Sequence, residues 1–344
     1  MAFPGDILAK DERLKGEKRI MKKNFLRSIF AGALAAAVLT GCGASGSAES
    51  SAAASQAGSA AASSEAASEA SSEAASKADT STAASEASAE AAEIPAPEGD
   101  DNKITIGATP VPHAQILDDV VKPALEAKGW DLEVVVFNDY IQPNTAVEDG
   151  ELDANYFETT RYLEEENKER NLHLVSVAEI HLEPMGLYSK KLKSLDELKD
   201  GASIAVPNDG SNESRALRLL ADNGLIKVDE SKDILTASDV TENPKNFEFV
   251  EVEAASLVRT LDDVDAAVIN GNYALEAGFS PAKDALVAEK TDTESIKQYF
   301  NNLVVKEGNE ETVKTKALKA ALTSPDVAKY IEENYQGSVI PAFH

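Results

Sequence analysis

Short apolar runs alternate with amphipathic stretches in the larger, C-terminal part of this 344-residue chain. The runs at 103–109 and 203–209 have the length of strands, and the stretches that follow, 113–128 and 212–223, carry apolar residues every three or four positions. Strands that alternate with helices are typical of α/β proteins with parallel sheets. Two successive runs of this kind, joined near 184–188, predict two lobes.

The same patterns predict the remaining elements. Pro123 is expected to kink the helix at 113–128, and Gly129 is expected to end it. Ser194 is expected to be the N-cap of a helix that Gly201 ends. The other expected strands are 131–137, 152–157, 173–182, 246–253, 265–270 and 300–308, and the other expected helices are 162–170, 254–261, one from Tyr273 to Gly278, and two that finish the chain.

The N-terminal region predicts export and lipid attachment. Residues 21–42 begin with a basic segment, continue with an apolar run from Ile29 to Leu39 and end in small residues, as secretory signals do. The run is too short to span a bilayer as a stable helix. Its last residues, LTGC, match the bacterial lipobox, which implies cleavage before Cys42 and a diacylglycerol on its sulfur. The alternatives are an uncleaved anchor helix and a secreted protein with one spare thiol.

Two other segments are not expected to fold. Residues 1–20 precede the signal, and because Met21 looks like the true start, they are interpreted as an over-long start or a cloning remnant. Residues 43–99 are mostly Ala, Ser and Glu and cannot bury enough surface to offset the entropy of ordering. They are expected to form a disordered tether, so the folded domain is expected at 100–344.

Charge and composition exclude several classes of function. The net charge is −27 without a basic cluster in the mature part, which argues against nucleic acid as a partner. Cys42 is the single cysteine, so neither a disulfide framework nor thiolate chemistry is expected in the folded part. No phosphate-binding glycine loop, nucleophile elbow or HExxH motif occurs. We therefore expect no enzyme and no cofactor.

No metal site is expected either, because the histidines lack the spacing of metal ligands. They are His113, His173, His181 and His344. His113 is expected to form a hydrogen bond at the start of its helix.

A carboxylate-binding site is predicted at 208–215, which reads NDGSNESR. Open α/β sheets bind ligands beyond the carboxyl ends of their strands, and a helix start that follows a strand presents free N–H groups to an anion. Arg215 lies in the first turn of that helix, where its guanidinium can form two hydrogen bonds with a carboxylate. The alternative is a surface arginine that pairs with Glu213 or Asp209.

Other candidate residues are asparagines at strand ends. Asn270 ends an apolar strand and suits the backbone groups of an amino acid, although turn-forming asparagines also occupy such positions. Asn302 is similar, and its neighbour Asn301 makes the choice between the two ambiguous.

The stretch from Asn138 to Leu163 contains four aromatic residues. They are Tyr140, Tyr156, Phe157 and Tyr162. Such rings could surround an apolar or thioether side chain, because sulfur packs well against aromatic edges. Alternation along a strand places Tyr156 and Phe157 on opposite faces, so at most one of them faces a given pocket. The alternative is that these rings belong to an ordinary core.

Several motifs together resemble one family. They are the lipobox, TPVPHAQIL, VFNDYIQPNTAVEDGELDANYF, GLYSKKLKSLDEL, AVPNDGSNESRAL, ENPKN and AVINGNYA. On these motifs the chain resembles the NlpA lipoprotein family, the methionine-binding lipoproteins of ABC importers, from about Ile104 to the C-terminus. The resemblance implies a type-II periplasmic-binding-protein fold with the ligand between two α/β lobes. Lobe one is then expected at about 102–184 plus 289–344, and lobe two at about 185–288.

The resemblance also implies roles for residues. Arg215 resembles the carboxylate-binding arginine of the family, and Asn270 and Asn302 resemble the asparagines that hold the ligand's backbone groups. The aromatic residues that match those around the ligand side chain are Tyr140, Phe157 and Tyr162.

One motif departs from the family pattern. The family usually reads ANxFQHxPYL, and this chain reads ANYFETTRYL. Thr159 stands where a histidine normally lines the pocket, Arg161 replaces a proline and Glu158 replaces a glutamine. A hydroxyl in place of an imidazole leaves more room and changes the polar contacts.

The resemblance implies a monomeric, extracytoplasmic receptor that is anchored to the bacterial cell membrane by a lipid on Cys42. It would bind methionine and deliver it to an ABC permease driven by a separate ATPase. The alternatives are a receptor for another amino acid or a small methionine-containing peptide, and a surface lipoprotein used in adhesion or as an antigen.

Overall fold

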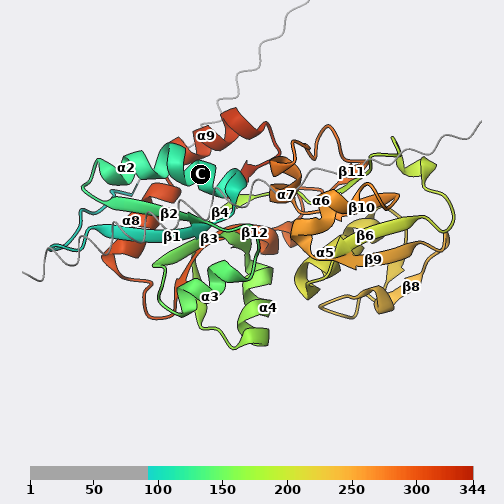
Figure 1. Cartoon of the computed structure of the whole chain (residues 1–344), viewed down its shortest axis with the longest axis horizontal. Coiled ribbons are helices and arrows are strands. Elements are labelled where there is room, and N and C mark those ends of the chain that lie inside the picture. Colours follow the sequence, from blue (N-terminus) through green and yellow to red (C-terminus); the bar gives the residue numbers. More distant parts are fainter. Residues whose placement is uncertain (1–91, 344) are drawn as a thin grey trace, which may run out of the picture. The chain divides into compact units, whose positions relative to one another are not determined.

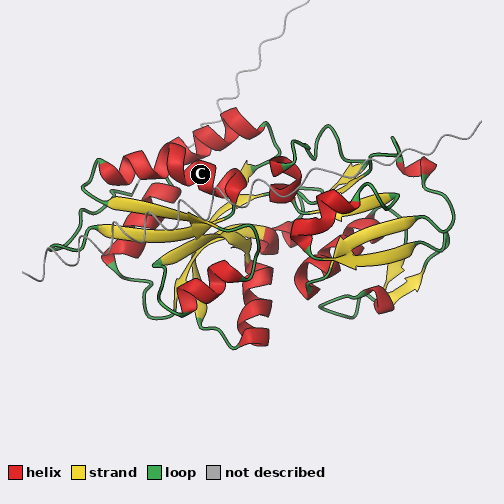
Figure 2. Cartoon of the chain, in the orientation of Figure 1, coloured by secondary structure: helices red, strands yellow, loops and turns green. Residues whose placement is uncertain are grey.

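The computed structural model describes residues 92–343. These residues form two main sheets with helices packed against them (Figures 1 and 2). The predicted signal, the lipobox Cys42 and most of the predicted tether lie outside the described residues. Among residues 92–343, no helix combines the length and the apolar character that crossing a membrane requires.

The first sheet has six strands in the order β13-β4-β12-β3-β1-β2. Strand β1 is parallel to β2 and β3, whereas β12 is antiparallel to both β3 and β4. The predicted α/β fold is confirmed, but the sheet is mixed and not parallel throughout, because β12 returns from the second sheet and inserts in the opposite direction. The strands are β1 (Lys103–Ala108), β2 (Asp131–Val136), β3 (Ala154–Thr159), β4 (Leu174–Leu182), β12 (Phe300–Lys306) and β13 (Ile340–Pro341).

The second sheet has five strands in the order β11-β5-β10-β6-β9. Strand β6 is parallel to β9 and β10, and β5 is antiparallel to β10 and β11. The strands are β5 (Gly186–Tyr188), β6 (Ser203–Pro207), β9 (Glu248–Val252), β10 (Ala266–Ile269) and β11 (Val287–Ala288), and a separate ribbon pairs β7 (Lys227–Val228) with β8 (Val240–Glu242). We call each sheet with its packed helices a lobe; the chain enters the second lobe after β4 and leaves it before β12.

The helix expected at 113–128 is built from three shorter pieces. Two π-helical segments, η1 (Pro110–Ala114) and η2 (Leu117–Val121), precede α2 (Lys122–Glu126). Pro123 lies in the first turn of α2, where its missing N–H costs little. The helix ends at Glu126, before Gly129 reaches its φ of +95°.

Two expected helices are shorter than their patterns predicted. The one expected from Ser194 to Gly201 is the single 3₁₀ turn η3 (Leu195–Glu197), and Ser194 makes no capping hydrogen bond. The carboxylate of Glu197 accepts from the backbone of Lys193 at 2.8 Å instead, and Leu198 is already extended. The helix expected at 254–261 is η5 (Ala254–Ser256) followed by α6 (Leu257–Thr260).

The remaining helices agree with their patterns or were not expected. Helix α3 (Gln142–Glu148) was not expected. Side chains that accept from a backbone N–H in the first turn cap α4 and α5, with Thr159 capping α4 and Asp209 capping α5. The other helices are α4 (Thr160–Arg170), α5 (Gly210–Asp222), η4 (Ala237–Asp239), α7 (Gly271–Glu276), η6 (Glu294–Tyr299), α8 (Val313–Leu322) and α9 (Pro325–Tyr335).

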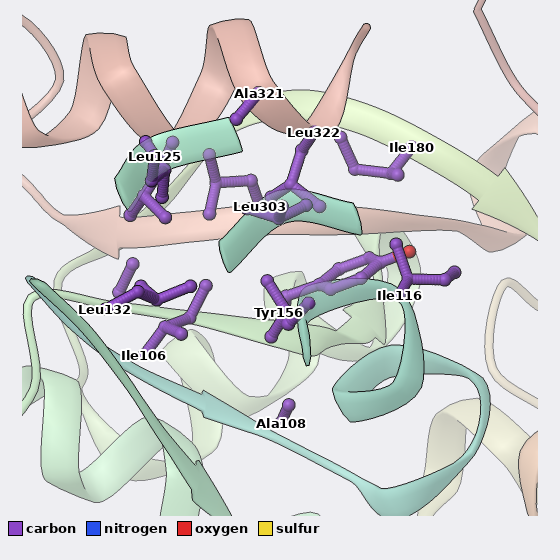
Figure 3. Packing of buried hydrophobic residues seen from close by; sticks show 14 of the residues in the cluster. Ile106, Ala108, Ile116, Leu125, Leu132, Tyr156, Ile180, Leu303, Ala321 and Leu322 are labelled. Carbon is purple, nitrogen blue, oxygen red and sulfur yellow. The ribbon is translucent and has the colours of Figure 1, made fainter. Parts of the chain in front are cut away.

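The main core of the first lobe lies between its sheet and α2, α8 and α9 (Figures 1 and 3). Ile106, Tyr156 and Leu303 project from neighbouring strands toward Leu125 and Leu322 from the helices. Because alternate residues of a strand face opposite sides, this packing fixes which residues of β3 and β12 face the other way.

Candidate functional site

A small cavity between the two lobes collects most of the predicted binding residues. It is lined by residues of both lobes and has a volume of only about 20 Å³. A cavity of that size holds about one water molecule, so an amino acid can enter only when the surrounding groups separate. The lining residues are Tyr140, Phe157, Glu158, Thr159, Tyr162, Glu183, Asn212, Arg215, Asn270, Gly271, Asn272 and Asn301.

Arg215 projects from the first turns of α5 and is 4% exposed. Its Nε and Nη2 donate to the two carboxylate oxygens of Glu289 at 2.8 and 2.6 Å, and Nη2 also donates to the backbone oxygen of Glu183 at 2.9 Å. The guanidinium lies 4.3 Å from the ring centroid of Tyr299. The partner of Arg215 is thus Glu289, from a distant part of the chain, and not Glu213 or Asp209.

The third guanidinium nitrogen of Arg215, Nη1, has no hydrogen-bond partner among residues 92–343. A guanidinium that is already oriented by a carboxylate and a ring can therefore still receive a second anion. This arrangement suits a carboxylate ligand better than a flexible surface arginine would.

Asn270 directly precedes α7 and faces the same cavity. Its Nδ2 donates to Oδ1 of Asn212 at 2.7 Å, while its own Oδ1 is buried without a partner. Asn272 accepts from the hydroxyl of Tyr140 at 2.5 Å, and its Nδ2 is buried without a partner. Unsatisfied buried polar atoms cost about 1–3 kcal/mol each, so a cavity with a free acceptor and a nearby free donor favours a polar ligand.

The aromatic side chains form one wall of the cavity. The ring centroid of Tyr140 lies 5.7 Å from that of Phe157 and 5.6 Å from that of Tyr162. Tyr273 of the second lobe joins them, with its centroid 5.0 Å from that of Tyr140. The structure thus brings the three sequence-predicted aromatic residues together, and Tyr273 packs on Tyr140 without lining the cavity itself.

Tyr156 and Asn302 do not line this cavity. Tyr156 is buried in the core of the first lobe, where its hydroxyl lies 2.6 Å from Nδ1 of His181. The side chain of Asn302 interacts with Ser176, at 2.7 Å, and with the backbone oxygen of Phe300. Neighbouring residues of β12 face opposite sides of the sheet, so Asn301 reaches the cavity and Asn302 does not.

The residues that depart from the family pattern lie at one end of the wall. Thr159 lines the cavity, and its hydroxyl accepts from the backbone N–H of Tyr162 at 3.3 Å. Glu158 is also a lining residue, but its carboxyl accepts from Nδ2 of Asn144 at 2.9 Å. Burial raises the pKa of Glu158 to about 8. Arg161 lies outside this cavity and pairs with Asp233 of the second lobe at 2.5 Å.

Glu183 is the main binding candidate that the sequence analysis missed. It follows β4 at the crossover between the lobes, is 5% exposed and lines the cavity beside Gly271. Burial raises the pKa of its carboxyl, while His113 and Arg215 oppose that rise. The sequence contained a signal for this residue: His181 and Glu183 are two positions apart at the end of a strand, so their side chains lie on the same face.

A second cavity, of about 460 Å³, lies on the other side of Arg215. Two of its arginines already pair with acids, Arg161 with Asp233 and Arg215 with Glu289. The smaller cavity, with its aromatic wall and orphaned amide atoms, is therefore the better candidate for ligand binding.

Comparisons with known proteins agree with this fold. A putative lipoprotein from Ruminococcus gnavus has a similar structure, with a TM-score of 0.68 and 51% identity over 70% of this chain and 99% of that one. A nutrient-binding protein from Burkholderia cenocepacia, solved with bound methionine, has a TM-score of 0.66 and 41% identity over 70% of this chain and all of that one (100%). The fold is thus that of substrate-binding lipoproteins.

Sequence comparison defines the family more closely. A family model described as NlpA lipoprotein matches residues 104–343, so this chain belongs to the NlpA lipoprotein family. The D-methionine-binding lipoprotein MetQ of Salmonella typhi is 41% identical over 246 residues, which are 71% of this chain and 89% of that protein. The methionine-binding lipoprotein MetQ of Bacillus subtilis is 39% identical over 249 residues, with the same coverage of 71% and 89%.

Proposed function

We propose that this chain is the substrate-binding protein of an ABC importer, that it binds methionine in the small interlobe cavity, and that it delivers the amino acid to a membrane permease. The observation that carries the proposal is the convergence of Arg215, Glu183 and Asn270 beside an aromatic wall. A cation, an anion and an unsatisfied amide acceptor complement the two charged groups of an amino acid. Relatives named as methionine-binding lipoproteins support the choice of ligand.

Each part of the ligand has a proposed partner. Arg215 receives the carboxylate, Glu183 and Oδ1 of Asn270 receive the ammonium, and Asn301 takes the place that the sequence analysis gave to Asn302. The aromatic wall and Thr159 then surround the thioether. The wall residues are Tyr140, Phe157 and Tyr162.

The remaining parts of the proposal concern location and partners. A lipid on Cys42 holds the protein at the outer side of the bacterial cell membrane, and the residues up to about 99 serve as a tether. The partners are a permease and its ATPase, and the protein acts as a monomer without chemical change of the ligand.

A second ligand class follows from Thr159 and Glu158. Together they leave more room at this end of the cavity than an imidazole would, and they change its polar contacts. This composition favours another amino acid, or a small methionine-containing peptide, as the alternative ligand.

Calorimetry on protein freed of bound ligand by unfolding and refolding tests the function. Methionine is expected to release heat with a dissociation constant well below that of other amino acids in a panel. Absence of heat with every amino acid would contradict the receptor proposal, and strong binding of a different amino acid would favour the second ligand class.

Arg215→Ala is expected to lose at least about 2 kcal/mol of binding free energy, which is about thirtyfold in affinity. The substitution removes the charged partner of the ligand carboxylate and leaves the carboxylate of Glu289 buried without a cation. Calorimetry measures the change. Arg218→Ala is the matched control: Arg218 lies one turn further along α5 and donates only to the backbone of Lys232 and Asp233. Equal affinities of the two variants would remove Arg215 from the site.

Thr159→His is expected to shift ligand preference, because an imidazole fills space and adds a donor where the hydroxyl stands. The ratio of methionine affinity to that of the next-best amino acid is the measurement. Thr160→His, one residue further along, serves as a control for the cost of the substitution itself, since Thr160 does not line the cavity. An unchanged ratio in Thr159→His would show that this position does not select the side chain.

A further inference from the structure

Two buried histidines converge on one oxygen of Glu183. Nε2 of His181 lies 2.7 Å from Oε1, and Nε2 of His113 lies 3.3 Å from the same atom. Both imidazoles are completely buried, and their ring centroids are 5.0 Å apart. They come from η1 and β4, so two separate elements of the first lobe converge on this carboxylate.

The surrounding atoms determine where each imidazole carries its proton. Nε2 of His113 faces only acceptors, namely Oε1 of Glu183 and, at 3.1 Å, Oδ1 of Asn301. Nδ1 of His113 lies 2.7 Å from the hydroxyl of Thr109, which can donate to it. The neutral His113 ring therefore donates its Nε2–H to Oδ1 of Asn301, with Oε1 of Glu183 close beside it, and accepts a hydroxyl proton at Nδ1.

His181 has the same arrangement. Its Nδ1 lies 2.6 Å from the hydroxyl of Tyr156, which explains why that ring faces the core and not the ligand cavity. Burial lowers the pKa of His113 to about 4 and that of His181 to about 3, so both rings are neutral near pH 7. The neutral His181 ring donates to Oε1 of Glu183, and His113 brings a second Nε2–H close to the same oxygen. Both N–H groups favour the ionised carboxylate and so oppose the burial that raises the pKa of Glu183.

The other oxygen of Glu183 lies toward the cavity. A Cβ at Gly271, a lining residue, would come within 3.1 Å of Oε2 and within 2.6 Å of the Cβ of Glu183. The backbone N–H of Asn272 lies close enough to the carboxyl to oppose the rise in its pKa. A glycine at 271 thus lets α7 approach closely while Oε2 stays on the ligand side.

We propose that His113 and His181 are positioning residues that hold Glu183 as an ionised receptor for the α-ammonium group, so that the site accepts only ligands with a free amino group. The inference rests on the proposed function, since it assumes an amino acid in this cavity. It extends that function by defining the ligand class: amino acids and peptides with a free N-terminus fit, whereas desamino analogues lack the group that Glu183 requires.

The side chains of His113, His181 and Glu183 are also candidate ligands of a metal ion. Their ligand atoms lie within 4.8 Å of one another, which is close enough for a shared ion. However, each Nε2 already faces an acceptor at hydrogen-bonding distance, and an ion would have to displace both N–H protons. The hydrogen-bonded reading satisfies every ring nitrogen without one.

Other titratable groups near Glu183 do not disturb a pH test. They are His113, His181, Arg215, Tyr140, Tyr156 and Tyr335. The phenols have raised pKa values because of burial, and the histidines have lowered ones. Glu158, another lining residue, has its pKa raised to about 8, so measurements from about pH 5.5 to 7.5 leave it mostly neutral.

The test compares methionine with its desamino analogue, 4-(methylthio)butanoate, by calorimetry. Wild-type protein is expected to bind the analogue at least about 100-fold more weakly, because the carboxylate of Glu183 would stay buried without its partner. His181→Met, which removes the donor, is expected to lose at least about tenfold in methionine affinity and less than about threefold in analogue affinity.

The pH profile separates positioning from simple structural damage. Without the histidine donor, Glu183 is protonated more easily, so methionine affinity of His181→Met is expected to rise from about pH 5.5 to 7.5 while that of wild type stays level. His181→Gln keeps an N–H near the same place and is expected to recover most of the affinity. Thr109→Val, which removes the hydroxyl that His113 accepts from, is a milder second variant with the same expected direction.

Each outcome decides the question. If His181→Met loses equal affinity for both ligands at every pH, the positioning role is overturned. Similar affinities of the wild-type protein for methionine and the analogue would also overturn it, and that comparison does not depend on the folding of a variant. Loss of methionine binding in EDTA, restored by zinc, would establish the metal reading instead. Failure of wild type to bind any amino acid contradicts the proposed function itself and not this inference alone.

Discussion

The Glu158 carboxyl shows how a single buried acid can be accommodated. Asn144 donates to its Oε2 at 2.9 Å, and Asn155 lies close enough to affect its pKa. Two acceptors in this group, Oε1 of Glu158 and Oδ1 of Asn155, are buried without a donor. A proton on Glu158 supplies the missing donor, in agreement with the pKa of about 8 that burial gives it.

Glu158→Gln is expected to stabilise the protein at alkaline pH. Because the folded-state pKa is raised, the contribution of Glu158 to stability is full below the unfolded pKa of about 4.5 and is lost as pH rises through about 8. The amide cannot ionise, so the variant should exceed wild type by roughly 1–3 kcal/mol at pH 9 and less at pH 6. Urea unfolding at both pH values measures this. Glu169→Gln, on the exposed side of α4, is the control, and equal differences at the two pH values would contradict the assignment.

At the scale of elements, the contact between α4 and the start of α5 joins the two lobes. The carboxyl of Glu165 lies close enough to the backbone N–H of Ser211, in the first turn of α5, for that group to lower its pKa, although burial raises the pKa overall. A Cβ at Gly210 would overlap Oε1 of Glu165, so this close approach depends on a glycine. An acid at a helix N-terminus is electrostatically favourable, and here the acid comes from the opposite lobe.

Gly210→Ala is expected to weaken ligand binding more than it weakens folding. The added methyl meets the end of the Glu165 side chain only when the lobes are together. Because that flexible end can turn away, the loss of binding is expected at the low end of the about 1–3 kcal/mol that overpacking costs. Methionine affinity by calorimetry and unfolding free energy by urea are the two measurements. The double variant Glu165→Ala/Gly210→Ala removes the collision and is expected to bind more tightly than Gly210→Ala; a double variant that binds more weakly would contradict the steric explanation.

At the scale of the whole described molecule, the residues that line the small cavity come from both lobes. Tyr140 and Phe157 belong to the first lobe, and Arg215 and Asn270 belong to the second. The hydroxyl of Tyr140 donates a hydrogen bond to Oδ1 of Asn272, from one lobe to the other. A cavity of about 20 Å³ is too small for an amino acid, so ligand entry must separate these groups and ligand binding must favour their return.

Asp233→Asn is expected to change methionine affinity by less than about threefold, although Asp233 pairs with Arg161 across the lobes. The side chain of Asp233 is 84% exposed, and water weakens an ion pair at such a position. Calorimetry at low and high salt checks the prediction. If Asp233→Asn loses more than threefold in affinity at low salt, and if high salt lowers the affinity of wild type to that of the variant, the pair contributes substantially to closure.

Much of the fold could be predicted from local pattern. Strands β1 and β6 and helix α5 have patterns that are complete within a few residues, and their predicted bounds are close to the observed ones. The direction of β12 was missed because strand pairing depends on contacts distant in sequence. Helix α3 was missed, although Pro143 lies in its first turn, where a proline is compatible with a helix.

The site was harder to predict for the same reason. Arg215 and Asn270 follow strands, where ligand groups are expected, and both line the cavity. The choice between Asn301 and Asn302 depends on a register shift in the pairing of β12, which no local pattern reveals. Glu289, the partner of Arg215, lies 74 residues away and carries no motif.

The position of β12 also determines the order in which the lobes can be completed. It lies between β3 and β4, so the middle strand of the first lobe is supplied by residues 300–306. Every strand of the second lobe has already been synthesised by residue 288. A chain that emerges N-terminus first can therefore pair its second sheet while the first is still divided, with β4 unable to join β3. Folding of the first lobe has to wait for nearly the whole polypeptide.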